Sequence, residues 1–375
     1  MPLFYLQPIE NSIAHQEYRP QQIGFQIKKH LSKEGSPDLN EVKIAFFCIE
    51  TNSQKMTDFR KYLYSLYVGN WNFTIADLGN LIESSSTSDT YFAINEIISF
   101  LAKKGITTIV IGGEQHLTYA LYRSFDRLEQ MVNLVSVDAK FDFSDDTELF
   151  SENSYFSRIL TENPVNLFDF NNLGYQSYYV AQEELDLLDK MCFEAYRLGS
   201  VVNDLPSIEP VMRDADIVSV DMTSVQARDV DSSTGYANGF TNREICTISR
   251  YAGISSNVQV YGIFDVPKTR LASELVAQMI WYFYEGYNFR IKELPVINDE
   301  NYTKYIVPID DDVQVEFFKS NLTGRWWMKP GSDKFAGHQN HLPLGLMPCN
   351  HKEYIEATQG SIPERWWKSY RKSMQ

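Results

Sequence analysis

Short apolar runs alternate with amphipathic stretches along most of this chain. Lys43–Ile49, Ile106–Ile111 and Val132–Val137 are each of strand length and rich in β-branched or aromatic residues. Runs of this kind are typical of buried β-strands. Three further runs have the same character and are also predicted as strands: Phe73–Leu78, Ile217–Val220 and Val258–Phe264.

Helical periodicity marks the stretches between these strands. Ile94, Ile97, Ile98 and Leu101 recur at i, i+3, i+4 and i+7, and Gly105 ends the helix that they predict. Other helices are predicted over Leu117–Leu128, Leu185–Leu198 and Leu271–Tyr284. Because strands alternate with helices, the pattern predicts an α/β fold with a parallel sheet covered on both faces.

The pattern changes after Asn288. Val313–Lys319 predicts one edge strand, and the rest of the tail is rich in Trp, Pro, Gly and His. We therefore divide the chain into an N-terminal segment (residues 1–40), an α/β domain (residues 41–290) and a C-terminal extension packed on that domain (residues 291–375).

The acid excess narrows the range of partners. The 375 residues carry a formal net charge of −15, and 43% of them are hydrophobic, as in globular proteins. Phosphate binding needs a basic face, so we expect no nucleic-acid partner. The first residues lack the pattern of a signal peptide, and no apolar run approaches the roughly 18 residues of a membrane span. Together with four cysteines without paired spacing, these features predict a cytoplasmic protein without a membrane partner.

Polar residues follow four of the predicted strands. The carboxyl ends of parallel strands meet at one edge of a sheet, so the residues placed there are expected to converge on a cleft. They are Gln115, Asp138, Asp142, Asp221 and Asp265. Two carboxylates as close in sequence as Asp138 and Asp142 suggest a cation site. Lys140 stands between them, so the chain itself supplies a cation at this place.

The same segments resemble motifs of the ureohydrolases, the family of arginase, agmatinase and formimidoylglutamase. That family carries G-G-D-H-S, D-A-H-x-D, S-x-D-x-D and E-x-N-P at successive strand ends. This chain has G-G-E-Q-H (residues 112–116), D-A-K-F-D (138–142), S-V-D-M-T (219–223) and F-D-V-P (264–267). Asn238–Glu244 is similar to the family's glycine-rich start of a helix.

The resemblance covers Lys43–Gly286. It implies a three-layer α/β/α arginase-like fold with a parallel sheet, and a homo-oligomer. It also implies a two-manganese site that hydrolyses guanidino or formimino C–N bonds. In such a site two ions lower the pKa of a bridging water, so that hydroxide forms near neutral pH.

The departures from the family pattern fall on the metal ligands. Ungapped matching puts Gln115 and Lys140 at the two histidine ligands and Thr223 at an aspartate ligand. Asp265 takes the place of the substrate-contacting glutamate. Three carboxylate ligands are kept: Asp138, Asp142 and Asp221. An ammonium among these carboxylates neutralises their repulsion but does not act as a Lewis acid.

We therefore expect an arginase-family protein that has lost the dinuclear manganese centre and its hydrolase activity, needs no cofactor, and keeps a binding or structural role. Lys140 is expected in a buried salt-bridge cluster with Asp138, Asp142 and Asp221. The alternative is an active C–N hydrolase of formimidoylglutamase type. It would hold a single divalent cation (Mn2+ or Mg2+) at the three aspartates, helped by Gln115 or His116.

The candidate site residues have separate expected roles. Catalysis would fall to Asp142, Asp265 and His116, and a small ligand in the cleft would contact Gln115, Lys140, Thr223 and Asn238. Lys140 as a base or nucleophile would need a lowered pKa, which nearby aspartates oppose. The tail also contains His338, His341, Cys349 and His351, but their spacing matches no common zinc pattern.

Overall fold

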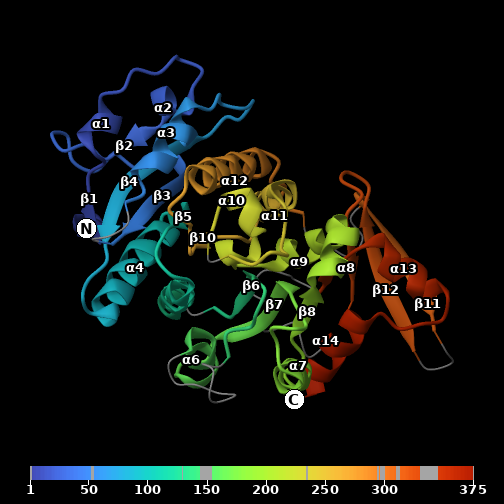
Figure 1. The fold of residues 1–375 in the computed structure, drawn as a ribbon. Coiled ribbons are helices and arrows are strands. Elements are labelled where there is room, and N and C mark those ends of the chain that lie inside the picture. Colours follow the sequence, from blue (N-terminus) through green and yellow to red (C-terminus); the bar gives the residue numbers. More distant parts are fainter. Residues whose placement is uncertain are drawn as a thin grey trace.

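The computed structural model describes residues 2–51, 55–128, 130–143, 154–233, 235–293, 295, 300–309, 313–329 and 345–374. Its main body is a ten-stranded sheet in the order β1-β4-β3-β5-β10-β9-β6-β7-β8, with β2 paired to β4 (Figure 1). The strands are β1 (Leu6–Gln7), β2 (Lys28–Lys29), β3 (Val42–Glu50), β4 (Thr74–Ile82), β5 (Thr107–Ile111), β6 (Val132–Val137), β7 (Leu167–Tyr175), β8 (Glu194–Arg197), β9 (Ile217–Asp221) and β10 (Val260–Phe264). The short β1 pairs antiparallel with β4, whereas the central strands β3, β5, β10, β9, β6 and β7 run parallel.

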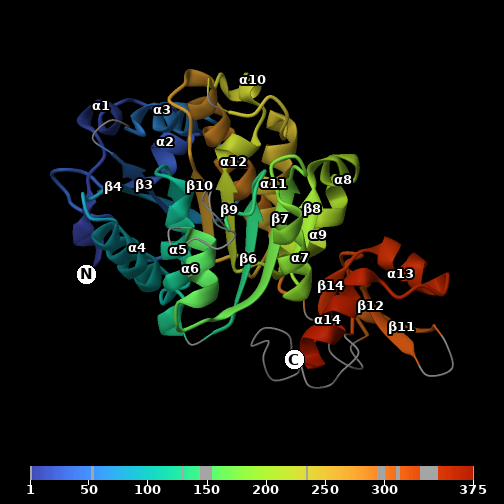
Figure 2. The same cartoon turned by 60° about the horizontal axis from the view of Figure 1, so that its bottom comes forward.

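Helices cover both faces of this sheet, which gives the predicted three layers (Figures 1 and 2). Ile44, Phe46 and Cys48 of β3 belong to one apolar core, and Ala45 and Phe47 belong to the other. Side chains alternate between the faces of a strand, so an uninterrupted apolar run such as β3 requires cover on both sides. The first core includes residues of α3 (Thr57–Ser65), α11 (Asn242–Ile254) and α12 (Arg270–Asn288), and the second includes residues of α4 (Thr87–Ala102), α5 (Thr118–Arg123) and α6 (Tyr155–Thr161).

Shorter helices complete the main body. The α-helices are α1 (Asn11–Ala14), α2 (Ile23–Gln26), α7 (Gln182–Lys190), α8 (Leu198–Asn203), α9 (Glu209–Asp214) and α10 (Ala227–Val230). The 3-10 helices are η1 (Pro2–Tyr5), η2 (Gln115–Leu117), η3 (Asp126–Leu128), η4 (Leu205–Ile208) and η5 (Met222–Ser224).

The six predicted strands correspond to β3, β4, β5, β6, β9 and β10. The helix predicted over Leu185–Leu198 is wrong beyond Lys190. The backbone of Cys192 is left-handed (φ 57°), and the chain then forms β8 and α8. A residue in this conformation cannot continue a right-handed helix.

Buried charge occurs within the main body at Asp77 of β4. Its carboxylate accepts hydrogen bonds from Arg60 Nε at 2.6 Å and Arg60 Nη2 at 3.0 Å. Tyr64 Oη donates to it at 2.6 Å and the Gly79 amide at 2.8 Å. The side chains of Arg60 and Asp77 are 2% and 0% exposed. The pair is therefore fully desolvated, but both charges have well-placed partners.

The tail forms a module of its own, which we call the C-terminal module (residues 300–309, 313–329 and 345–374). It contains a sheet in the order β11-β12-β13-β14. The strands are β11 (Tyr302–Pro308), β12 (Gln314–Ser320), β13 (Trp326–Met328) and β14 (Met347–Cys349), followed by α13 (His351–Thr358) and α14 (Glu364–Met374). The strand predicted at Val313–Lys319 is present as β12, but β12 lies between β11 and β13 and is not an edge strand.

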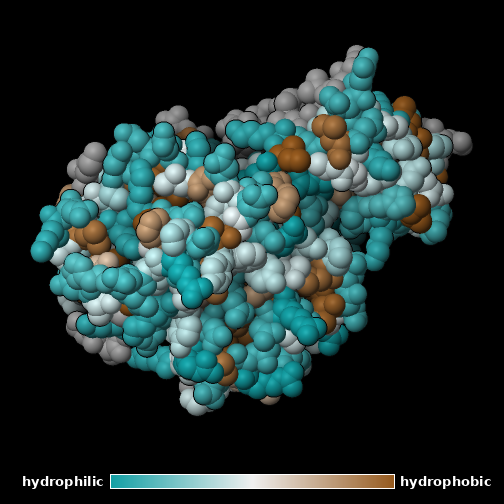
Figure 3. Space-filling model, turned by 90° about the horizontal axis from the view of Figure 1, so that it is seen from above, coloured by the Kyte–Doolittle hydropathy of each residue, from teal (hydrophilic) through white to brown (hydrophobic). Residues whose placement is uncertain are grey.

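Ion pairs join this module to the main body. Lys368 Nζ lies 3.3 Å from Glu194 Oε2, and Lys372 Nζ lies 2.8 Å from Asp169 Oδ1. Figures 1 and 2 show the module beside β8 and α9, at one end of the main sheet. The face of the molecule in Figure 3 is mainly hydrophilic, with hydrophobic residues in small separate groups. Among the helices that the structure describes, none has the length and apolar character needed to cross a bilayer.

Candidate functional site

Four neighbouring strands, β5, β10, β9 and β6, end at one edge of the main sheet. Asp221 is the last residue of β9, Asp265 directly follows β10, and Asp138 directly follows β6. Asp142 and Asp265 have left-handed backbones, with φ of 53° and 52°, a conformation that aspartate tolerates better than most residues. The sheet order therefore explains why residues far apart in sequence meet here.

The turn after β5 depends on glycine. Gly112 has a φ of 89°, and a Cβ atom there would lie 2.6 Å from the Ile49 carbonyl oxygen. Gly113 is also left-handed, with a φ of 76°. Two residues without side chains thus let the chain pass close to β3 and turn Gln115 into the site.

These strand ends line one open cavity of about 440 Å³. The structure brings eight of the predicted site residues together there: Gln115, His116, Asp138, Lys140, Asp142, Asp221, Thr223 and Asp265. Glu114, Ser154, Tyr155 and Tyr236 line it too and were not predicted. We call this space the acidic cavity.

Asn238 lies outside the acidic cavity. It lines a separate cavity of about 580 Å³ near the ends of β7 and β8. Its Nδ2 donates to Tyr178 Oη at 3.1 Å, and its carbonyl accepts from Gln176 Nε2 at 3.1 Å. These contacts turn the segment toward β7, away from the predicted ligand position.

Asp221 and Asp265 are held by donors from the chain. The Thr223 amide donates to Asp221 Oδ1 at 2.7 Å, and Thr223 Oγ1 donates to Asp221 Oδ2 at 2.6 Å. The Gln115 amide donates to Asp265 Oδ2 at 2.8 Å. Burial, together with the charge of Asp265, raises the pKa of Asp221 to about 7. Burial likewise raises the pKa of Asp265 to about 6. Both groups are thus costly to ionise in this setting.

Asp138 and Asp142 form a pair. Burial raises the pKa of Asp138 well above its ordinary value, and the charges of Asp142 and Asp221 add to the effect. Burial also raises the pKa of Asp142, although a hydrogen bond from Asp138, the charge of Lys140 and a hydrogen bond from Tyr155 act in the opposite direction. Asp138 is therefore the proton donor in this pair and Asp142 the acceptor.

Lys140 does not occupy a metal position among the aspartates, so the expected buried salt-bridge cluster is not formed. Its side chain is exposed, and its ammonium lies 5.9 Å from the centre of the Tyr236 ring. Burial alone would lower the pKa of Lys140, but Tyr236 and the charges of Asp142 and Asp138 raise it. The predicted position of the Lys140 side chain was wrong, because an ammonium at the cavity mouth stays in contact with water, whereas an ammonium buried among the aspartates does not.

The imidazole of His116 has neighbours other than the aspartates. Its Nδ1 lies 2.7 Å from Tyr91 Oη, and its Nε2 lies 3.8 Å from Glu114 Oε2. Burial lowers the pKa of His116 despite the charge of Glu114. This histidine is therefore neutral near pH 7 and is set at the side of the cavity.

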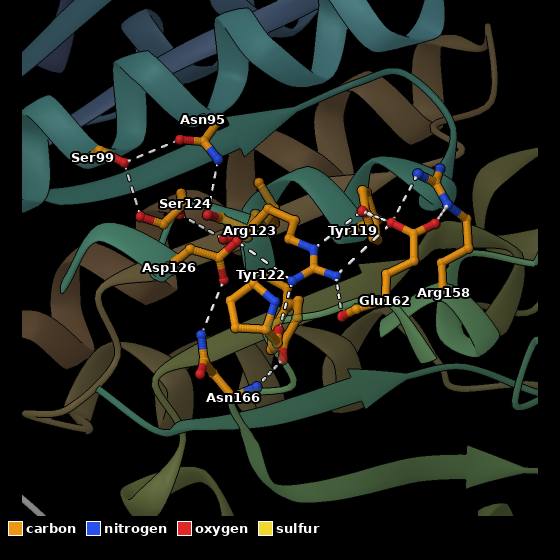
Figure 4. Close-up of polar contacts among 12 residues, drawn as sticks. Asn95, Ser99, Tyr119, Tyr122, Arg123, Ser124, Asp126, Arg158, Glu162 and Asn166 are labelled. Carbon is orange, nitrogen blue, oxygen red and sulfur yellow. Dashed lines mark hydrogen bonds and ion pairs between the residues drawn. The ribbon is translucent and has the colours of Figure 1, made fainter. Parts of the chain in front are cut away.

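Helix α6 carries Tyr155, which lines the acidic cavity. Figure 4 shows the polar contacts around Glu162, at the C-terminal end of α6. Arg158, one turn after Tyr155, donates from Nε to Glu162 Oε1 at 2.7 Å. Tyr119 Oη also donates to the Glu162 carboxylate, and Arg123 Nη2 donates to the Glu162 carbonyl at 2.6 Å. The contacts of Tyr119 and Arg123 tie α6 to α5, so Tyr155 is placed by residues that themselves lie outside the cavity.

The residues of the cavity depart from the family's two-manganese donor set. Thr223 donates to both carboxylate oxygens of Asp221, and Gln115 Nε2 is turned toward Ser136 Oγ at 3.3 Å. In the part of the chain that the structure describes, no three His, Cys, Asp or Glu side chains are grouped so as to hold a metal ion. The donor set also lacks both histidines of the family pattern.

The three layers and the strand-end cavity define an arginase-like α/β protein. Residues 49–270 match the arginase family, and the chain belongs to that family. No curated protein matches the chain in sequence.

Solved structures share this fold. A crystal structure of formiminoglutamase from Trypanosoma cruzi with Mn2+ has a TM-score of 0.60 and 15% identity, and the match covers 68% of this chain and 96% of that one. Formimidoylglutamase from Bacillus subtilis has a TM-score of 0.57 and 14% identity, over 68% and 89% of the two chains. Agmatine ureohydrolase from Thermoplasma volcanium has a TM-score of 0.53 and 20% identity, over 67% and 92%.

The C-terminal module lies beyond the residues that match the family. Of the tail residues considered for zinc, His338 and His341 lie outside the described residues. Cys349 is buried in β14, and the His351 ring lies 5.2 Å from the ring of Trp326. Cys349 is packed within the module, whereas His351 is exposed at its surface.

Proposed function

We propose that this arginase-family protein binds a small organic cation in the acidic cavity and does not carry out two-metal hydrolysis. One observation carries the proposal. Asp138, Asp142, Asp221 and Asp265 line a single cavity, and within the described residues none of them is paired with a cationic side chain at 4.0 Å or less.

Buried carboxylates without a counter-ion favour a cationic ligand on physical grounds. Removing a carboxylate from water costs several kcal/mol unless an opposite charge compensates it. A guanidinium or amidinium compensates more than one oxygen, because its planar N–H groups match carboxylates in pairs. The family resemblance to enzymes of guanidino and formimino compounds supports the same ligand class.

Departures at three ligand positions support the loss of hydrolysis. Gln115, Lys140 and Thr223 stand where the family pattern has two histidines and an aspartate. A glutamine amide is a weaker ligand than an imidazole, an ammonium has no lone pair to offer an ion, and Thr223 lacks the carboxylate of the aspartate at whose position it stands. Without ions to lower the pKa of a water, the cavity has no strong nucleophile near neutral pH.

A single-cation hydrolase is the second candidate. It is favoured by the position of Asp138, Asp142 and Asp221 at the ends of the adjacent strands β6 and β9. Oxygen ligands of this kind suit Mg2+ or Mn2+. The substrate would be a formimino or guanidino compound.

Calorimetric titration separates the two candidates. We expect methylguanidinium to bind the purified protein without added metal, and Asp221→Asn to weaken that binding about tenfold, since one charge-assisted contact is lost. Asp216→Asn is the matched control, because Asp216 is another buried aspartate, at the opposite end of β9. It should leave binding unchanged.

Metal content and turnover complete the test. We expect elemental analysis to find less than one Mn per chain after incubation with Mn2+, and no hydrolysis of formiminoglutamate, agmatine or arginine. Stoichiometric Mn together with turnover of any of these compounds would establish the hydrolase and refute the proposed function.

A further inference from the structure

We propose that Lys140 makes the acidic cavity selective for zwitterions, by pairing with an anionic group at the far end of a ligand whose cationic group lies among the aspartates. This inference rests on the proposed function and adds a second recognition element to it. It gives a role to the residue that departs most strongly from the family pattern.

The backbone of Lys140 is fixed in place. Its amide donates to Asp138 Oδ1 at 3.1 Å, and its carbonyl accepts from Asn172 Nδ2 at 2.8 Å. The preceding carbonyl, of Ala139, accepts from the Gln176 amide at 3.0 Å. Asn172 is fully buried on β7. The loop is thus tied to the next strand, and the Lys140 side chain starts from a defined point at the cavity mouth.

The Lys140 side chain is available to a ligand. It is exposed, lines the acidic cavity, and makes no ion pair within 4.0 Å among the described residues. Its ammonium lies near the Tyr236 ring, whose centre is 4.4 Å from that of Tyr179. Two packed rings therefore support the ammonium without neutralising it.

Lys140 and Glu114 lie on opposite sides of the cavity, and Asp138 and Asp142 lie on the same side as Lys140. Glu114 follows β5 and Lys140 follows β6, with β10 and β9 between them. Three strand spacings of about 4.8 Å separate the two sides by roughly 14 Å. Asp265 and Asp221, at the ends of the two intervening strands, lie between them. A carboxylate that reaches Lys140 is kept apart from Glu114, while a cation on the same molecule reaches the aspartates.

Two probes that differ only at the far end test this assignment. 4-Guanidinobutanoate and its neutral amide, 4-guanidinobutanamide, share the same guanidinium and chain length. We expect the wild-type protein to bind the carboxylate about tenfold more tightly than the amide, as one charge-assisted contact predicts. Lys140→Met should reduce this ratio to about one, and Lys140→Arg should keep most of it. Lys103→Met, at the exposed C-cap of α4, is the control for a loss of net charge and should keep the ratio.

The outcomes separate failure of this inference from failure of the proposed function. Equal binding of the two probes by wild type, or a ratio that survives in Lys140→Met, would overturn the role of Lys140 and leave the cation site in place. Tighter binding of both probes to Lys140→Met by the same factor would also overturn it, because Lys140 would then be a competitor of the ligand. If neither probe nor methylguanidinium binds wild type, the proposed function fails as well.

Discussion

Two regions of this molecule bury carboxylates, and they treat them in opposite ways. On β4, Asp77 is paired at 2.6 Å and 3.0 Å with the guanidinium of Arg60. In the acidic cavity, Asp138 and Asp221 are also buried, but their hydrogen-bond partners are a backbone amide, a threonine and a neighbouring carboxylate. The first region supplies its own counter-charge and contributes to the fold. The second region gives its carboxyl groups hydrogen-bond partners but, among the described residues, no cationic partner within 4.0 Å, as the proposed site for an external cation requires.

Breaking the Arg60–Asp77 pair should have the largest effect. Arg60→Met leaves the Asp77 carboxylate buried without a counter-charge, which costs about 3–5 kcal/mol of unfolding free energy. Lys61→Ala is the comparison: it removes the ion pair between Lys61 and Asp58, whose side chains are 51% and 69% exposed, respectively. The loss of this exposed pair should cost less than about 1 kcal/mol of unfolding free energy. Urea unfolding at pH 7.5 measures both. Equal losses would mean that Arg60 does not neutralise a buried charge.

The same substitution in the two regions should have opposite effects. Asp77→Asn removes a charge that Arg60 needs and should destabilise the protein at neutral pH. Asp221→Asn removes a carboxyl group whose folded pKa is raised to about 7. A raised pKa means that the folded state binds the proton more tightly than the unfolded state does. The stabilisation that protonated Asp221 gives the folded state is therefore complete below about pH 4 and is lost as the pH rises through about 7.

Asp221→Asn should therefore gain stability relative to wild type between pH 4 and pH 7, by on the order of 4 kcal/mol, and the difference should be constant above about pH 8. Thermal unfolding of wild type, Asp221→Asn and Asp77→Asn across this range measures it. A difference between wild type and Asp221→Asn that does not change with pH would contradict the uncompensated state of Asp221.

The fold was predictable where local pattern and burial agree. β3 is apolar on both faces and was recognised from that alone, whereas β7 was missed because Asp169, Asn171 and Asn172 interrupt its apolar run. Asn172 is fully buried even so, since it bonds the Lys140 carbonyl. A polar residue with a distant partner looks the same in sequence as one in a loop.

The site was predictable only for residues whose positions follow from strand ends. Asp138, Asp221 and Asp265 belong to this class. Tyr155 does not, because α6 is held in place through contacts of Tyr119 and Arg123 of α5 with Glu162, and pairs so far apart in sequence carry no local signal. The direction of the Lys140 side chain depends likewise on Tyr236, which is distant in sequence. The residues next to Lys140 in the chain predict that it follows a strand end, but they do not predict where its side chain points.

The smallest effect should come from Tyr236, and it sharpens the contrast between fold and ligand site. Tyr236 is only half-buried, so Tyr236→Leu should change the unfolding free energy by no more than about 0.5 kcal/mol. Losing the ring beneath Lys140 removes a contact worth roughly 0.5–1 kcal/mol at an exposed site. The carboxylate-to-amide ratio for the two guanidino probes should therefore fall about two- to fivefold.

Tyr282→Leu is the control for Tyr236→Leu, because Tyr282 is an exposed aromatic residue on α12 and should leave the ratio unchanged. If Tyr236→Leu instead destabilises the protein as strongly as Arg60→Met, Tyr236 belongs to the packed structure. The acidic cavity would then resemble the Asp77 region, with its side chains fixed by folding and not held ready for a ligand. If Tyr236→Leu lowers the carboxylate-to-amide ratio while the unfolding free energy stays nearly constant, the acidic cavity and the Asp77 region remain distinct.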